Sequence, residues 1–68
     1  MEKETIGQFI TRLKKEKRIT GAELARRVGV SRQTMSYWEN DQRTPSIKHI
    51  LKLADALNIS HIDILNKI

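Results

Sequence analysis

Apolar residues recur along this chain at the spacing of amphipathic helices. In the first helical stretch they stand at positions i, i+3, i+4 and i+7, as Ile6, Phe9, Ile10 and Leu13. This spacing places them on one face, because an α-helix turns once in about 3.6 residues. The pattern of the whole chain predicts an all-α protein with five helices, at about residues 5–17, 21–28, 32–40, 47–57 and 61–67.

A hydroxyl residue that can cap a helix stands at or just before the start of each of these stretches. The five are Thr5, Thr20, Ser31, Ser46 and Ser60. A Ser or Thr at this position accepts a hydrogen bond from a backbone N–H that the first helical turn leaves without a partner. In three cases a Gln or an acidic residue follows three positions later, which predicts capping boxes for Thr5 with Gln8, Thr20 with Glu23 and Ser60 with Asp63.

The inward faces of the later helices follow from the same periodicity. We expect burial of Leu24, Ala25 and Val28 in the second helix, Met35 and Trp38 in the third, and Ile47, Ile50, Leu51, Ala54 and Leu57 in the fourth. Trp38 has an alternative role, because an aromatic ring can also stack on a nucleic-acid base. Its register with Met35 favours the core.

Only three residues, Gly29, Val30 and Ser31, separate the second and third predicted helices. Gly29 stands where many helices end in the left-handed conformation, which glycine adopts at little steric cost. Two short helices joined by so tight a turn are typical of the helix-turn-helix arrangement.

The segment ELARRVGVSRQTMSYWENDQRTPS, residues 23–46, resembles the Cro and lambda-repressor-like helix-turn-helix family, also called the XRE family. The resemblance extends from about Thr5 to Leu65, and it rests on Leu24, Ala25 and Val28, the turn at 29–31, Trp38-Glu39-Asn40 and Pro45-Ser46. It implies a compact five-helix, lambda-repressor-like domain over residues 1–68. Residues 1–4 are mostly charged and terminal, and we expect them to fray.

The resemblance implies that the third helix enters the major groove of DNA. Arg32, Gln33, Ser36 and Tyr37 would then contact bases, since they lie opposite the apolar positions of that helix. Arg can pair bidentately with guanine and Gln with adenine, while Tyr37 offers its ring to a thymine methyl or its hydroxyl to a phosphate. The alternative is a surface helix whose polar side chains only face water.

Contacts to the sugar-phosphate backbone are implied for Lys14, Gly21, Ser31, Thr34, Asn40 and Arg43. Three positions depart from the family. Lys14 stands where many members have an Arg that pairs with the Glu at position 39, and Gly21 where many have Gln, so Gly21 can offer a phosphate only its backbone N–H. Asp41 replaces the usual Gly. With Asp41 there, we expect the end of the third helix to be strained or shifted by one residue. The charge of Asp41 would also oppose a nearby phosphate.

Composition and charge limit the classes of function that fit this chain. Thirteen Lys and Arg residues stand against eight Asp and Glu, a formal charge of +5 that suits a polyanionic partner. Cysteine is absent, and His49 and His61 are expected on solvated helix surfaces, so neither a metal nor a cofactor is expected. No apolar run has the length of a membrane span or a signal peptide. These features predict an intracellular protein, and the resemblance implies a cytoplasmic protein of a bacterium, phage or plasmid, associated with the nucleoid when bound to DNA.

The last predicted helix carries Ile62, Ile64, Leu65 and Ile68, more apolar side chains than one inward stripe uses. We expect Ile62, Leu65 and Ile68 to contact a second copy of the chain. Such a dimer would place two recognition helices about 34 Å apart, one turn of DNA. The alternative is that all four side chains close the core of a small protein.

The sequence thus predicts a transcriptional regulator, a repressor that binds an inverted-repeat operator in double-stranded DNA as a homodimer, and that a regulatory protein partner could control. The alternative is an interaction adaptor or antitoxin-like protein that binds another protein through the same fold. The polar Arg32, Gln33 and Tyr37 disfavour that alternative. An enzyme is not expected, because the sequence has neither a nucleophile–base pair at a plausible spacing nor a glycine-rich phosphate loop.

Overall fold

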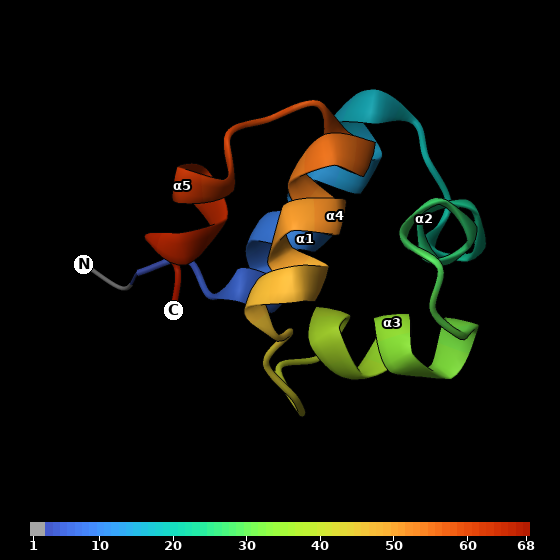
Figure 1. The fold of residues 1–68 in the computed structure, drawn as a ribbon, viewed down its shortest axis with the longest axis horizontal. Coiled ribbons are helices and arrows are strands. Elements are labelled where there is room, and N and C mark those ends of the chain that lie inside the picture. The colour runs from blue at the N-terminus through green and yellow to red at the C-terminus, as the bar shows by residue number, and fades with distance from the viewer. Residues whose placement is uncertain (1–2) are drawn as a thin grey trace.

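The structure, a computed structural model, describes residues 3–68. Its helices are α1 (Ile6–Lys17), α2 (Gly21–Val28), α3 (Arg32–Glu39), α4 (Ile47–Leu57) and α5 (His61–Leu65) (Figure 1). The predicted all-α fold is confirmed, and α1 to α4 begin and end within one residue of their predicted bounds. Only α5 is clearly shorter than predicted. Residues 1 and 2, part of the segment expected to fray, lie outside the described residues.

The helices surround a core to which all five contribute. α1 and α4 lie at the centre, with α2 and α3 on one side and α5 on the other (Figure 1). Fully buried side chains come from every helix and include Ile10, Leu24, Met35, Leu53 and Ile64. α3 therefore lies at the rim of a small core, with one face packed and the other open. Within residues 3–68, none of the helices combines the length and apolarity needed to cross a bilayer.

All five predicted capping residues cap their helices. Each has an extended backbone, and its hydroxyl accepts from a backbone N–H in the first helical turn. The complete capping box predicted for α1 is also confirmed. Thr5 Oγ1 accepts from the Gln8 N–H at 3.1 Å, and Gln8 Oε1 accepts from the Thr5 N–H at 3.0 Å.

The capping boxes predicted at Thr20 and Ser60 are wrong, although both hydroxyls cap. The Glu23 carboxylate turns away from Thr20 and pairs with Arg26, whose hydrogen bond holds the pKa of Glu23 below its usual value. The Ser60 hydroxyl accepts from the backbone N–H two residues ahead, so Asp63 does not complete the box. An ion pair within the helix thus replaces the box at α2.

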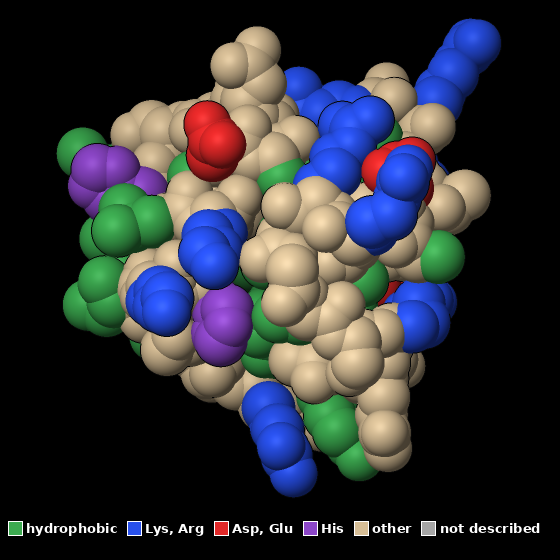
Figure 2. Space-filling view, turned by 45° about the vertical axis from the view of Figure 1, so that its right-hand side comes forward, with side chains coloured by type: hydrophobic (Ala, Val, Ile, Leu, Met, Phe, Trp, Pro, Cys, Tyr) green, Lys and Arg blue, Asp and Glu red, His purple; other side chains and the backbone are tan. Residues whose placement is uncertain are grey.

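The buried face of α4 differs from the prediction. Leu53 is fully buried, whereas Ile47 and Leu51 are 68% and 50% exposed. The reason is that α4 packs against both α2 and α5, which turns its buried stripe away from these two side chains. Figure 2 shows hydrophobic side chains at the surface along its left edge. His49, expected on the solvated surface, is half-buried, with its ring centroid 5.2 Å from that of Trp38.

The loop after α3 is fastened to the first turn of α1. Asp41 has a φ of 58°, and its carboxylate accepts hydrogen bonds from the Gly7 N–H at 2.9 Å and the Thr5 hydroxyl at 2.7 Å. A Cβ on Gly7 would lie 2.4 Å from the carbonyl oxygen of Glu39, so only glycine allows this approach. α3 ends at Glu39, and Asp41 takes the left-handed conformation at the position where the family usually has Gly, which bears out the strained alternative. The charge of Asp41 serves the N-terminus of α1, where the helix dipole favours an anion.

An ion-pair cluster, not predicted from the sequence, joins the two ends of the chain. The Glu4 carboxylate pairs with Arg12 Nε at 2.7 Å and with Lys67 Nζ at 3.3 Å. The hydrogen bond from Arg12 lowers the pKa of Glu4 from 4.5 to about 2, so the carboxylate stays ionised even in mildly acidic solution. Both cations also lie over the ring of Phe9. The cluster therefore holds the segment after α5 against α1, and it keeps Glu4 in place, so the expectation that residue 4 frays is wrong.

Alanine at Gly7 is expected to destabilise the fold by about 1–3 kcal/mol. Its Cβ would overlap the carbonyl oxygens of Trp38 and Glu39 and push α1 away from α3. Urea denaturation at neutral pH measures the change in the free energy of unfolding. Gly21→Ala is the matched control, because its Cβ would meet the movable guanidinium of Arg32, and we expect a change below about 1 kcal/mol. Equal losses from the two substitutions would contradict this explanation.

Candidate nucleic-acid interface

The turn between α2 and α3 has the geometry that its glycine predicts. α2 ends at Gly29, whose φ of 86° is left-handed. The backbone N–H groups of Gly29 and Val30 both donate to the carbonyl of Ala25, at 2.9 and 3.0 Å. These bonds satisfy the end of α2 and redirect the chain at once into α3. The predicted helix-turn-helix is confirmed.

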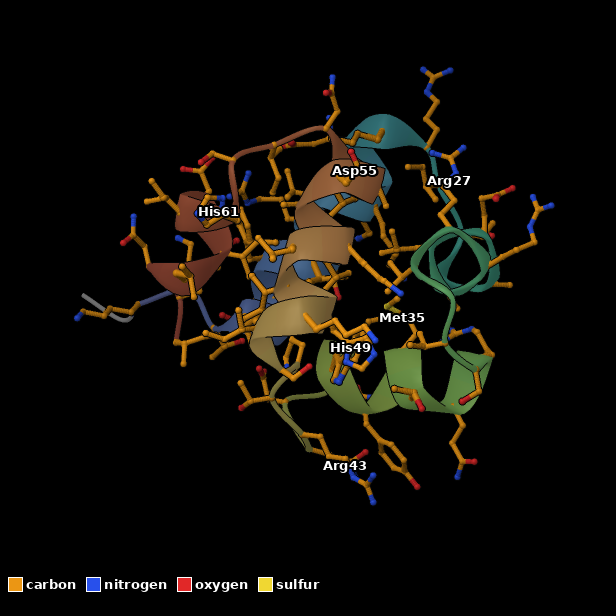
Figure 3. All side chains as sticks on the ribbon, viewed as in Figure 1. Arg27, Met35, Arg43, His49, Asp55 and His61 are labelled. Atoms are coloured by element: carbon orange, nitrogen blue, oxygen red, sulfur yellow. The ribbon has the colours of Figure 1, made fainter. Side chains whose placement is uncertain are left out.

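The core contacts of α3 decide which of its faces is open. Met35 and Trp38 are 0% and 3% exposed, which confirms the prediction that Trp38 belongs to the core. The opposite side carries Arg32 and Gln33, which are exposed, and Ser36 and Tyr37, which are half-buried. Figure 3 shows Met35 pointing from α3 toward α4 and Arg43 projecting on the other side. The four residues predicted to contact bases therefore share one face, which we call the outer face of α3.

Tyr37 links two other polar residues of this region. Its hydroxyl accepts a hydrogen bond from Gln33 Nε2 at 2.9 Å. The guanidinium carbon of Arg43 lies 4.6 Å from the centre of its ring, a cation–π contact. Arg43, predicted to contact the DNA backbone, is thus brought next to the outer face by a residue predicted to contact bases.

Arg32 folds back across the start of α2. Its Nη1 atom lies 3.4 Å from Glu39 Oε2. A Cβ on Gly21 would lie 2.8 Å from the guanidinium carbon, so the missing side chain of Gly21 leaves the space that Arg32 fills. This contact was not predicted. The only signal in the sequence is that Arg32 and Glu39 stand seven residues apart, two turns on one side of a helix.

Lys14 and Glu39 form the ion pair that the resemblance implies. Lys14 Nζ lies 2.5 Å from Glu39 Oε1, and the two side chains are only 13% and 12% exposed. Glu39 therefore joins α1 to α3 and also holds Arg32. Because two cations share one carboxylate, the group keeps a positive charge beside the turn. Lys14, predicted to contact DNA, has its ammonium on this carboxylate.

The remaining predicted backbone contacts lie at the two ends of α3. At the start of α3, Ser31 Oγ accepts from the Thr34 N–H at 3.0 Å, and the two hydroxyls lie 3.0 Å apart. At its end, Asn40 Nδ2 donates to the Ser36 carbonyl oxygen at 3.0 Å. These polar side chains complete the helix ends and are exposed or half-buried, so they flank the outer face.

Comparison with known proteins matches residues 10–64 to the family described as Helix-turn-helix. The chain is also similar to y4dJ of Sinorhizobium fredii, named an uncharacterized HTH-type transcriptional regulator. The two are 35% identical over 60 residues, which cover 88% of this chain and 78% of y4dJ. These matches confirm the resemblance that residues 23–46 predicted.

Solved structures share the fold at similar levels of identity. The P22 c2 repressor in complex with a synthetic operator has a TM-score of 0.88 and 30% identity, over 97% of this chain and 100% of that chain. SinR of Bacillus subtilis in complex with DNA has a TM-score of 0.83 and 34% identity, over 90% of this chain and 98% of that chain. This chain is also similar to a chain in the solved complex of SinR with the SinI protein.

Proposed function

The chain belongs to the helix-turn-helix family of transcriptional regulators, and on this premise we propose that it is a sequence-specific repressor. A homodimer would bind an inverted-repeat operator in double-stranded DNA, in the cytoplasm. The observation that carries the proposal is the outer face of α3, where polar side chains stand open at the rim of the molecule. The P22 c2 repressor and SinR, solved with DNA, support the same use of the fold.

Each side chain of the outer face matches a group in the major groove. Arg32 can donate two hydrogen bonds to guanine, and Gln33 can bond bidentately to adenine. Ser36 can bond to a base edge, while the ring of Tyr37 can contact a thymine methyl. The contact of Arg32 with Glu39 does not oppose this role, because Arg32 is itself exposed and Glu39 keeps Lys14 as its partner when Arg32 turns away. DNA can therefore displace the carboxylate at small cost.

Groups around the outer face suit the flanking phosphates. They are Ser31 and Thr34 near the start of α3, and Asn40 and Arg43 near its end. Gly21 is buried beside Arg32, and Lys14 is paired with Glu39, so these two would reach a phosphate only after Arg32 and Lys14 move. Arg43 and Lys14 supply charge, and the others supply hydroxyl, amide or backbone N–H donors. Such contacts would position the protein on DNA without selecting a sequence.

The C-terminal apolar surface supports a homodimer. Ile62, Leu65 and Ile68 are 55%, 39% and 63% exposed, whereas Ile64 is fully buried. The core therefore takes one of the four side chains and leaves three on the surface. A two-fold contact through these three would cover them and pair two recognition helices. A partner protein is a further candidate for control, as the SinR–SinI complex illustrates for SinR.

Selection from a randomised duplex pool at near-physiological salt tests the proposal, since this salt suppresses non-specific phosphate binding. We expect enrichment of an inverted repeat with half-sites about one helical turn apart. A reporter fused to that operator would then show lower expression when the protein is present. Failure of the folded protein to enrich any sequence would overturn the proposal and favour the adaptor.

Arg32→Ala and Arg43→Ala are expected to weaken DNA binding in different ways. Loss of Arg32 should cost about 1–3 kcal/mol on the operator and relax the preference at one base pair, because a bidentate contact with guanine is lost. Loss of Arg43 should weaken binding to all sequences and make the salt dependence shallower by about one phosphate contact. Fluorescence anisotropy over several salt concentrations measures both. Indistinguishable effects of the two variants would refute this division.

Ile62→Glu is expected to produce a folded monomer, because Ile62 is exposed and its charge would prevent association. Sedimentation velocity gives the oligomeric state, and circular dichroism reports the fold. Ile64→Glu is the matched control, since the same change at a fully buried position should unfold the protein. A dimeric Ile62→Glu variant would exclude this surface as the interface.

A further inference from the structure

Tyr37 stands between two polar side chains and contacts both. Its hydroxyl accepts a hydrogen bond from Gln33 Nε2 at 2.9 Å, and its ring lies beneath the guanidinium of Arg43. From this geometry we infer that Tyr37 is a positioning residue whose hydroxyl holds the Gln33 amide ready for one adenine, instead of forming a hydrogen bond to DNA itself. The inference rests on the proposed function and deepens it by assigning a specificity-determining role.

The hydroxyl can position Gln33 only if Tyr37 is itself held. Tyr37 is half-buried. Its backbone carbonyl accepts from the N–H of Gln42 at 2.8 Å and from that of Arg43 at 3.4 Å, which folds the loop back onto the end of α3. The Arg43 guanidinium then covers one face of the ring. Since a tyrosine has only two side-chain torsions, these contacts leave its hydroxyl at a defined place.

Gln33 is the side chain that gains from such support. It is exposed in the first turn of α3, where an unsupported Gln would sample many rotamers and lose that freedom on binding. Tyr37 lies four residues later, one turn away on the same side of the helix. Ordering the amide before DNA arrives reduces the entropy lost on binding, which raises affinity for the base that the amide fits.

The bond to Tyr37 leaves Gln33 able to recognise adenine. The amide carries two N–H donors and a carbonyl oxygen with two lone pairs. Tyr37 uses one N–H. The second N–H and the carbonyl oxygen remain for adenine N7 and N6, which is the bidentate contact that distinguishes adenine in the major groove.

The main rival is a Tyr37 hydroxyl that donates to a phosphate. A phosphate contact strengthens binding to every sequence, whereas support of Gln33 strengthens binding only where Gln33 meets its base. The base dependence of the effect therefore separates the two roles. Tyr37→Phe is the informative variant, because phenylalanine removes the hydroxyl and keeps a ring for Arg43.

The experiment uses the full chain and the operator obtained by selection, together with a panel of operators that each carry one changed base pair. Affinities are measured for the wild type, Tyr37→Phe, Gln33→Ala and the double variant. The base pair whose preference disappears in Gln33→Ala is assigned to Gln33. We expect Tyr37→Phe to reduce the preference at that base pair by about 2- to 10-fold, as loss of one hydrogen bond would. Preferences elsewhere and the salt dependence should not change.

In the Gln33→Ala background, Tyr37→Phe should have no further effect, since the group that it positions is gone. Tyr37→Ala, which also releases Arg43, should add a uniform loss and a shallower salt dependence. NMR of the free protein gives a readout that needs no DNA: the side-chain amide of Gln33 should become more mobile in Tyr37→Phe.

Several results would overturn the inference. An equal loss on every operator, or a loss that persists in the Gln33→Ala background, would place the hydroxyl on a phosphate. An unchanged Gln33 amide in the free Tyr37→Phe variant would show that the hydroxyl does not hold it. If the wild type binds no duplex selectively while the NMR effect is present, the proposed function has failed, and the inferred role in specificity fails with it.

Discussion

The arrangement of this domain depends on the close contact between the end of α3 and the first turn of α1. Gly7 allows it, because any side chain there would overlap the last carbonyl oxygens of α3. Asp41 holds it, because its carboxylate accepts from the Gly7 N–H and from the Thr5 hydroxyl. A rigid contact at this point fixes where α3 ends and how it lies on the core. The direction of the outer face follows from it, since Met35 and Trp38 must point inward from the same helix.

Glu39 adds an electrostatic contact beside this steric one. Its carboxylate is nearly buried between α1 and α3, where it pairs with Lys14 and reaches Arg32. A nearly buried carboxylate is costly unless it is paired, so Glu39 and Lys14 require each other. Lys in place of the more common Arg does not prevent the pair. Arg32 is the exposed member, and only its contact can exchange readily with a ligand.

The sequence was sufficient to predict the helices, the turn and the outer face, because these follow from local patterns. Capping residues, glycine at the turn and apolar spacing each act within a few residues. The prediction failed where contacts between helices that are distant in the sequence determine which side chains are buried. The α4 face is the clearest case: periodicity allows Ile47 and Leu51 to point inward, but the positions of α2 and α5 bury Leu53 instead. The contact of Arg32 with Gly21 likewise depends on how α2 meets α3, which no local pattern records.

The contacts of the outer face indicate how a domain this small can order its exposed side chains before a ligand binds. Arg32 contacts Glu39, Gln33 contacts Tyr37, and Tyr37 contacts Arg43. Each contact is partly exposed and therefore weak, so it limits the freedom of a side chain without preventing its exchange for another partner. Part of the cost of ordering these side chains is met when the protein folds, because their supports are α3 and its adjoining loop. A change at Tyr37 or Glu39 should then alter recognition through a neighbour, even where the substituted residue touches no ligand.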